Sequence, residues 1–412
     1  MLEIKGNETY IGVSIFVFVV TLLLISKLFK KPNKSNKSSS SSTKNITNSK
    51  DSNTEEIKEE REKKKATTDG NAEANSKPTI QQHKLFFKSL RAGDVVNSLK
   101  LSPDGKYLSL CGSERSVKMF IYETMIGSNK TPPQSFSLQL PFDNATCISW
   151  GSNGSQLVLY AVLNESKKLI AFNVLDQKNS QGKSYEQLWS VPLEQKSEIK
   201  SICSSDKSPY ILTCGEDTVV KIWSLKGQLV QTINTSQIKA YMASMSPDGR
   251  FFSLATFSSE VKVFEALKKK DGQIDQCKRV MSLSGFKMSI HSVSFNSDGL
   301  KIVTSSKDQS IKLYSLNVKY SLDVDPELLY SVTSNFGVID MISVSPDDQV
   351  IAAANQKYLC FMEFSNGSVI DSIELIGINK INSMVWSKDS QYLIAGGDDK
   401  QLYFFNNPKK LK

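Results

Sequence analysis

Residues 96–120 read VNSLKLSPDGKYLSLCGSERSVKMF and form one structural unit. Two apolar-alternating segments flank an S-P-D-G turn, and a third segment ends in the aromatic residue Phe120. At such a turn Pro103 presets φ, Asp104 accepts local hydrogen bonds, and Gly105 closes the hairpin. Alternation with a period of two residues predicts β-strands. The unit is therefore expected to be three antiparallel strands joined by tight turns.

The same unit recurs along the chain. Turn positions equivalent to Asp104 follow at intervals of 42 to 53 residues, at Asn153, Asp206, Asp248, Asp298, Asp347 and Asp389. The third strands are expected to end at Phe120, Phe172, Trp223, Phe264, Tyr314, Phe361 and Phe405. Short strands repeating about every 40–45 residues are typical of propeller blades, and longer loops explain the wider intervals. We predict an all-β, seven-bladed propeller over residues 79–407.

The last unit supplies only three strands, through residues 402–405, so its outer strand must come from elsewhere. Residues 84–90, KLFFKSL, precede the first inner strand and carry apolar side chains between lysines. Lysines of this kind suit an exposed sheet edge. We expect this segment to close the ring against the last blade and to bury Leu85 and Phe87.

An uncharged segment, TYIGVSIFVFVVTLLLIS, occupies residues 9–26. As a helix it would be about 27 Å long, which matches the hydrocarbon core of the endoplasmic reticulum, also about 27 Å thick. We predict a transmembrane helix anchored by Tyr10 at the interface and by apolar residues that include Ile11 and Ile25.

A cleaved signal peptide is the alternative interpretation of that segment. No small-residue cleavage site follows, whereas lysines come at once. Five lysines stand in the dozen residues after the segment, and one stands in residues 1–8 before it. The positive-inside rule then predicts a lumenal N-terminus and a cytosolic propeller in a single-pass protein.

Residues 27–78 form a polar linker rich in Ser, Asn, Lys and Glu. Such a composition cannot bury enough apolar surface to offset the entropy of ordering, so we predict disorder. Residues 55–65, EEIKEEREKKK, contain i,i+4 pairs such as Glu59 and Lys63. These pairs fit either a transient helix or a solvated charged tether.

The chain offers few residues for catalysis or metal binding. None of the cysteines forms a CxxC pair, which predicts reduced thiols in a cytosolic domain. The two histidines, His83 and His291, have no acidic or thiol partner at ligand or triad spacing. The Gly-rich phosphate loop, the dinucleotide fingerprint and the nucleophile elbow are all missing from the sequence. We therefore expect no catalytic residue, metal site, cofactor or small-molecule substrate.

Basic residues cluster in several places, although the net charge of +9 is mild for 412 residues. The clusters lie at residues 167–168, 268–270, 278–279 and in a basic tail at 408–412. They could bind RNA or acidic lipid, or they could be solvated loops and a solvated tail. No aromatic-interleaved RNA-binding motif accompanies them.

On its repeats the chain resembles the WD-repeat family. The stretches GEDTVVKIW, SKDQSIKLY and GDDKQLYFF carry the family's turn aspartate and strand-ending aromatic residue. The residues expected to be structural at blade turns are Asp104, Asp217, Trp223, Asp248, Asp298, Asp308, Asp347 and Asp399. The family's Gly-His dipeptide is absent, and Gly285-Phe286 stands where one is expected. The family's His–Ser–Asp–Trp hydrogen-bond tetrad therefore cannot form in its usual way.

The resemblance is strongest to members of the family with the same N-terminal apolar segment and polar linker. It implies a scaffold at the endoplasmic-reticulum membrane that takes part in the unfolded protein response. The implied partners are an eIF2α-type stress kinase or proteins related to translation. An RNA-binding or translation-linked tether that uses the lysine clusters is the alternative, and an enzyme in the central channel is a third hypothesis.

Overall fold

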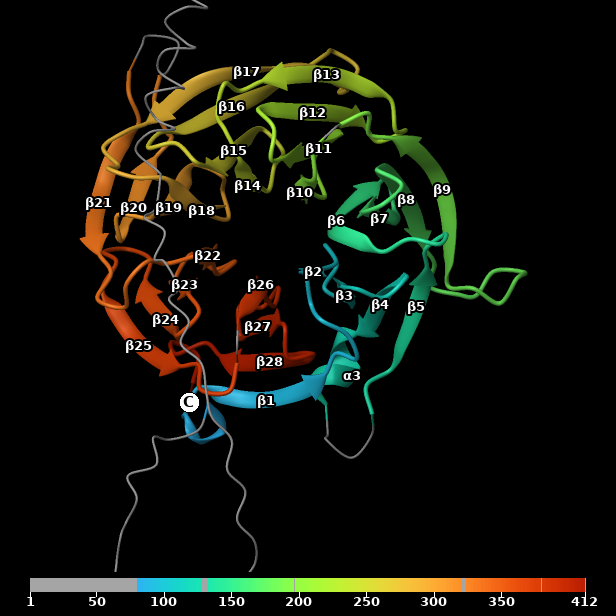
Figure 1. The fold of residues 1–412 in the computed structure, drawn as a ribbon, viewed down its shortest axis with the longest axis horizontal. Coiled ribbons are helices and arrows are strands. Elements are labelled where there is room, and N and C mark those ends of the chain that lie inside the picture. The colour runs from blue at the N-terminus through green and yellow to red at the C-terminus, as the bar shows by residue number, and fades with distance from the viewer. Residues whose placement is uncertain (1–79, 128–131, 196, 320–323, 379, 412) are drawn as a thin grey trace, which may run out of the picture. The chain divides into compact units, whose positions relative to one another are not determined.

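The computed structural model describes residues 80–127, 132–195, 197–319, 324–378 and 380–411. These residues form seven four-stranded antiparallel sheets, which Figure 1 shows arranged radially around a common centre. The predicted seven-bladed propeller is therefore confirmed. The predicted membrane helix, with Tyr10, Ile11 and Ile25, and the linker lie outside the described residues. No helix within the described residues is long and apolar enough to cross a membrane.

We number the blades 1 to 7 along the chain. The innermost strands are β2 (Ser98–Leu101), β6 (Ala145–Asn153), β10 (Ile199–Cys203), β14 (Ala240–Met245), β18 (Ile290–Phe295), β22 (Met341–Val344) and β26 (Ile381–Trp386). The second strands are β3 (Tyr107–Cys111), β7 (Gln156–Leu163), β11 (Tyr210–Gly215), β15 (Phe251–Thr256), β19 (Lys301–Ser306), β23 (Val350–Ala354) and β27 (Tyr392–Gly397). The second strands are almost wholly buried, because each of their faces packs on a neighbouring blade.

The third and fourth strands complete each blade. The third strands are β4 (Ser116–Ile121), β8 (Lys168–Val174), β12 (Val219–Ser224), β16 (Val261–Lys268), β20 (Ser310–Ser315), β24 (Tyr358–Glu363) and β28 (Gln401–Asn406). The outer strands are β5 (Ser135–Gln139), β9 (Tyr185–Pro192), β13 (Leu229–Asn234), β17 (Ile274–Leu283), β21 (Glu327–Thr333), β25 (Val369–Glu374) and, for blade 7, β1 (Phe86–Arg91). Two short helices are also described, η1 (Ile80–Gln82) and α3 (Tyr122–Ile126).

Strand β1 closes the ring beside β28, where the blue start of the described chain meets its red end in Figure 1. The two strands are antiparallel, with Phe86 opposite Phe405 and Leu90 opposite Leu402. Leu85, directly before β1, is buried, and its carbonyl accepts a hydrogen bond of 2.7 Å from the Asn406 N–H. The pairing thus lies one to two residues further along than the segment 84–90 that the sequence indicated.

Phe87 does not have the buried position that we expected. The register steps from Phe86 to Lys88 across a β-bulge, and Phe87 is the extra residue. A bulge turns its extra side chain away from the regular pleat, and Phe87 is accordingly 38% exposed. Five further outer strands carry a bulge at the same place, at Leu188, Val230, Val280, Leu329 and Ile370. These bulges bend the outer edges and so discourage edge-to-edge association.

The apolar core lies between neighbouring blades. Phe404 in β28 packs with Leu108 and Phe120 of blade 1. The next residue, Phe405, packs with Phe361 of blade 6. Successive side chains of a strand point to opposite faces, so two adjacent phenylalanines can join blade 7 to both of its neighbours.

Candidate functional site

The predicted turn residues Asp104, Asp248, Asp298 and Asp347 lie between the first and second strands of their blades. Asp104 Oδ1 accepts hydrogen bonds from Ser102 Oγ at 2.6 Å and from the Lys106 N–H at 3.0 Å. Asp248 and Asp347 accept from the equivalent serine, and Asp298 accepts from the backbone two residues later. These carboxylates shape hairpins. We call the side of the ring that carries them the turn face.

Neighbouring turns on the turn face are tied to each other. Asp348 Oδ2 of blade 6 accepts hydrogen bonds from Asn296 Nδ2 at 2.8 Å and from Ser297 Oγ at 2.7 Å, both in blade 5. Lys388 Nζ of blade 7 donates to the Pro103 carbonyl of blade 1 at 3.0 Å. Hydrogen bonds between blades therefore hold these neighbouring turns together.

The second set of predicted residues, Asp217, Asp308 and Asp399, lies between the second and third strands, on the opposite side, which we call the loop face. Asp308 accepts hydrogen bonds from the Lys287 N–H at 2.7 Å and from the Ser310 N–H at 2.9 Å. Burial acts to raise the pKa of Asp308, but the hydrogen bonds from Ser310 and Lys287 outweigh it and lower the pKa. This carboxylate thus joins its turn to the loop that enters the blade.

In blades 1 and 2 the entering loop and the turn between the second and third strands are also joined, but there the aspartate lies in the entering loop. Asp143, in the loop that enters blade 2, is buried and accepts from the Glu165 N–H at 3.0 Å and from the Ser166 N–H at 2.8 Å. Asp94 in blade 1 accepts from the Glu114 N–H at 2.7 Å. Neither aspartate was predicted from the sequence, because neither occupies the family's turn position.

In each of four blades, a lysine in the third strand contacts the loop that enters the same blade. It stands two residues before the strand-ending aromatic residue and donates from Nζ to a backbone carbonyl 26 to 28 residues earlier. The pairs are Lys118 with Ala92, Lys221 with Leu193, Lys262 with Thr235, and Lys312 with Gly285. Trp223 Nε1 donates to Thr213 Oγ1 at 3.0 Å. The four lysine contacts join the entering loop to the third strand without the family's tetrad, whereas the Trp223 contact joins the second strand to the third. A V-K or I-K pair in the sequence marks each of these lysines.

The innermost strands surround a channel of about 850 Å³. One equivalent position in each blade lines it, namely Asn97, Thr146, Lys200, Tyr241, His291, Asp340 and Asn382. In five blades the register skips this residue, which marks a β-bulge. Bulges re-aim side chains, and here they give the channel a ring of seven polar or aromatic groups. We call these residues the mouth ring.

Three adjacent members of the mouth ring contact one another. The rings of Tyr241 and His291 have centroids 6.2 Å apart, and His291 Nδ1 lies 3.2 Å from Asp340 Oδ1. On the other side of Tyr241, Lys200 Nζ lies 2.7 Å from Glu198 Oε2 and 3.7 Å from Glu216 Oε1. A carboxylate partner for His291 could not be predicted from the sequence, because Asp340 comes from the next blade.

An exposed apolar patch borders the ring at blades 4 and 5. It consists of Ile238, Tyr241, Phe257 and Met288, whose exposed fractions are 61%, 41%, 58% and 45%. The Phe257 N–H donates to the Ile238 carbonyl at 3.0 Å, so these two residues are neighbours. The Ile290 N–H donates to the Ser258 carbonyl, which brings the Met288 loop beside Phe257. We call these four residues the loop-face patch.

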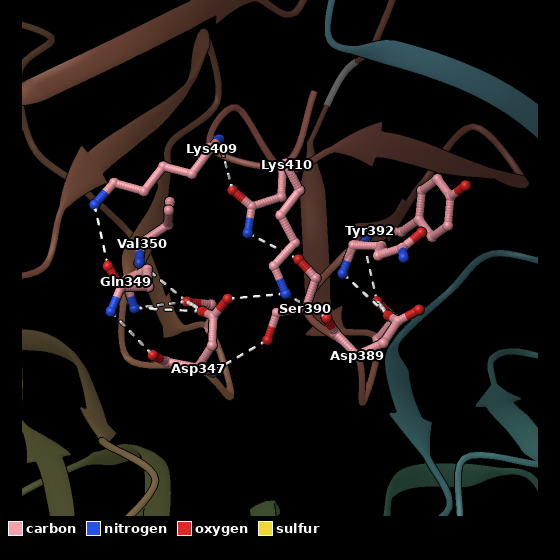
Figure 2. A network of polar contacts seen from close by, with 12 residues as sticks. Asp347, Gln349, Val350, Asp389, Ser390, Tyr392, Lys409 and Lys410 are labelled. Carbon is pink, nitrogen blue, oxygen red and sulfur yellow. Dashed lines mark hydrogen bonds and ion pairs between the residues drawn. The ribbon is translucent and has the colours of Figure 1, made fainter. Parts of the chain in front are cut away.

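Lys409 and Lys410 of the predicted basic tail are exposed, and both form ion pairs with the ring. Figure 2 shows Lys409 and Lys410 lying over the turns of blades 6 and 7. Lys410 Nζ is 3.0 Å from Asp347 Oδ2 and also donates to the Asp389 carbonyl, and Lys409 pairs with Glu363. Burial acts to raise the pKa of Asp347, but hydrogen bonds from Ser345 and Lys410 and the Lys410 charge lower it. The tail is thus part of the turn face.

The thiols and histidines show no reactive arrangement within the described residues. The six cysteines are buried and unpaired, and burial raises the pKa of their thiols. No group of three or more His, Cys, Asp or Glu residues in this part of the chain could hold a metal ion. His83, near the closing strand, lies 3.7 Å from Asp371 of blade 6.

Four segments of the chain match a known family of repeats. The profile of the family described as WD domain, G-beta repeat, matches residues 85–120, 187–224, 277–315 and 374–406. Each match begins in or next to an outer strand and ends in the third strand of the following blade. The sequence repeat is therefore offset by one strand from the blade, which is why β1 must complete blade 7.

Two similar proteins are transducin beta-like protein 2 of Mus musculus, 26% identical over 341 residues, and of Homo sapiens, 25% identical over 342 residues. Both alignments cover 79% of this chain and 73% of the relative. The WD repeat domain-containing protein 83 homolog of Dictyostelium discoideum is 29% identical over 125 residues, which are 30% of this chain and 35% of that protein. The chain therefore forms a closed seven-bladed ring, carries WD repeats in four matched segments, and is similar to transducin beta-like protein 2.

Proposed function

We propose that this protein is a scaffold that binds other proteins on its loop face. The loop-face patch is the observation that carries the proposal. Phe257 and Ile238 each expose more than half of their surface, at 58% and 61%, beside the channel. Contiguous exposed apolar side chains of this kind mark interaction sites, because their burial by a partner removes them from water.

We further propose that the scaffold is held at the endoplasmic-reticulum membrane by residues 9–26 and acts in the unfolded protein response. The uncharged segment and the lysines that follow it support the anchor. The role in stress signalling, with an eIF2α-type kinase or translation-related proteins as partners, is what the resemblance of the sequence to WD-repeat proteins of this layout implies.

Proximity labelling from the full-length protein in cells tests the binding face. We expect Phe257→Glu to remove a group of labelled proteins that the wild-type chain labels, because a carboxylate cannot be buried in an apolar contact without a large cost. Leu328→Glu is the matched control, since Leu328 is also exposed, at 46%, but lies on outer strand β21. Identical labelling by wild type and Phe257→Glu would refute the loop face as the binding surface.

A lysine cluster in blade 4 favours a second candidate, an RNA-binding tether. Lys268 at the end of β16 and Lys269 and Lys270 in the following turn are exposed, and Lys278 and Arg279 are exposed on β17. Phosphate contacts make binding fall steeply with salt concentration, whereas apolar contacts do not. Titrating RNA onto the purified full-length protein at increasing salt therefore separates the two candidates.

A further inference from the structure

A pocket of about 200 Å³ lies between blades 5 and 6. Ile311 and Val332 of blade 5 and Cys360 and Met362 of blade 6 line it, and none of its lining residues is charged. The pocket shares no residue with the channel or with the loop-face patch. It is therefore a separate gap in the packing between two blades.

The gap lies where blade 6 has a small side chain at a position that is large in every other blade. In blade 5, Lys312 stands two residues before the strand-ending Tyr314. In blade 6, the register of the second and third strands puts Met362 at the place of Tyr314, and Cys360 therefore at the place of Lys312. The residues at this position in the other blades are Lys118, Ile170, Lys221, Lys262, Lys312 and Tyr403. All six are larger than cysteine, so blade 6 alone lacks a side chain that fills this space.

The surroundings of the pocket favour an uncharged occupant. In blade 5, burial lowers the pKa of Lys312, and the nearby Asp308 carboxylate counteracts part of that effect. The corresponding turn of blade 6, residues 355–357, reads Asn-Gln-Lys and contains no carboxylate. A cation in this pocket would be buried without a counter-charge, which is costly. The position that holds a lysine in four blades therefore suits a neutral group in blade 6.

The volume of the pocket matches a single aromatic ring. An apolar cavity of about 150 Å³ binds benzene, whereas small-molecule sites usually measure about 300–1,000 Å³. The pocket is thus large enough for one aromatic side chain and too small for a typical cofactor. Thr333, Asn335 and Ser368 are exposed residues of its lining. They offer neutral hydrogen-bonding groups to a phenol hydroxyl or to the backbone that carries the ring.

Contacts within the ring hold the walls of the pocket in place. Tyr330 Oη of blade 5 donates a hydrogen bond to the Phe364 carbonyl of blade 6 at 3.2 Å. Gly367, with a φ of +73°, brings the turn of blade 6 so close that a Cβ atom there would lie 2.7 Å from the Tyr330 ring. Asn355 Nδ2 donates to the Phe336 carbonyl at 2.8 Å and fixes the entering loop. A ring that enters the pocket therefore has little to order, which favours binding.

We propose that the pocket between blades 5 and 6 binds one aromatic side chain, phenylalanine or tyrosine, of a partner protein. The ring fills the space beside Cys360, and the partner's neighbouring residues lie over Val369, which lines the pocket and is 45% exposed. The polar linker before η1 cannot supply the ring, because residues 32–79 contain no Phe, Trp or Tyr. This contact goes beyond the proposed loop-face binding and does not depend on the loop-face patch.

The test is a selection of random peptides from a display library. The immobilised target is the full-length Phe257→Glu variant, which removes peptides that need the loop-face patch. We expect a group of selected peptides to share one Phe or Tyr that cannot be replaced by Ala. Cys360→Ile gives blade 6 the side chain that Ile170 supplies in blade 2, and it should weaken these peptides about ten- to a hundredfold. Cys360→Ala leaves the pocket open and should bind them as wild type does.

A second variant changes the entrance of the pocket and leaves its buried walls intact. Val369→Asp puts a carboxylate beside the bound ring and should weaken the same peptides about fivefold or more. Leu229→Asp is the matched control, because Leu229 has the corresponding position on outer strand β13 of blade 3 and is also 45% exposed. Melting temperatures show which variants are folded, and the Val369 and Leu229 pair decides the matter if Cys360→Ile is not.

Two results would overturn the aromatic site. One is a set of selected peptides in which no Phe or Tyr is required, including a set that prefers lysine. The other is equal binding of the aromatic peptides to wild type, Val369→Asp and a folded Cys360→Ile variant. The loop-face patch takes no part in this selection, so its failure in the proximity labelling is a separate result.

Discussion

The two faces of the ring differ in how many of their side chains contact other parts of the ring. On the turn face, aspartates and lysines contact each other across blades, as Asp348 does with Asn296 and Lys410 with Asp347. On the loop face, Asp143 and Asp308 are used in the same way, but the apolar side chains of the loop-face patch remain exposed. Motif residues thus mainly hold the propeller together, while the positions between the motifs leave apolar side chains at the surface.

The largest expected effect concerns the closing strand, which both faces need. A chain that begins at residue 92 lacks β1, and with it several ladder hydrogen bonds worth about 0.5–1.5 kcal/mol each. It also lacks the buried Leu85 side chain, worth about 1.5–3 kcal/mol. Because the total stability of a domain is about 5–15 kcal/mol, we expect aggregation or a sharply lowered melting temperature.

The control for that truncation is a chain that begins at residue 79, which keeps β1 and Leu85. Thermal melting followed by circular dichroism compares the two. Equal melting temperatures would show that β1 contributes nothing to ring closure. They would also contradict the distinction between residues that hold the ring together and residues exposed on its surface.

A middle-sized effect is expected from the framework of the loop face. Asp143→Ala leaves the Glu165 and Ser166 N–H groups without their charged acceptor in a partly buried place, which should lower the free energy of unfolding by about 1.5–3 kcal/mol. Urea denaturation measures this change. Phe257→Glu, on the same face, should leave the free energy of unfolding almost unchanged. An equal loss of stability in both variants would show that Phe257 holds the ring together as much as Asp143 does.

The smallest effect is expected at the tail. Lys410→Met removes a surface ion pair with Asp347 and should cost about 0.2–1 kcal/mol at neutral pH. The pKa of Asp347 is lowered in the folded state, so its contribution is present above the ordinary value of 3.8 and is lost as the pH falls through the folded pKa. Urea denaturation of wild type and Lys410→Met should therefore differ at pH 7 and converge at about pH 2. A difference that stays constant with pH would show that the ion pair with Asp347 is not its source.

Local sequence rules were enough to predict the blades. The alternation of apolar residues and the S-P-D-G turns act within a few residues, so the strands around Asp104 and Asp248 could be placed without a structure. The offset of the repeat predicted that an N-terminal strand completes blade 7, and β1 pairs with β28. The interpretation was wrong about Phe87, because a bulge depends on the pairing register of two strands more than 300 residues apart.

The sequence by itself therefore determined the secondary structure and the number of blades, since both follow from short, repeated patterns. Only the tertiary structure decided which residues form the mouth ring and the loop-face patch. Tyr241, His291 and Asp340 are about 50 residues apart in the chain and meet because adjacent blades place equivalent positions side by side. Single-residue bulges then turn Tyr241 and His291 toward the channel, and such a shift in register leaves no periodic signal in a sequence.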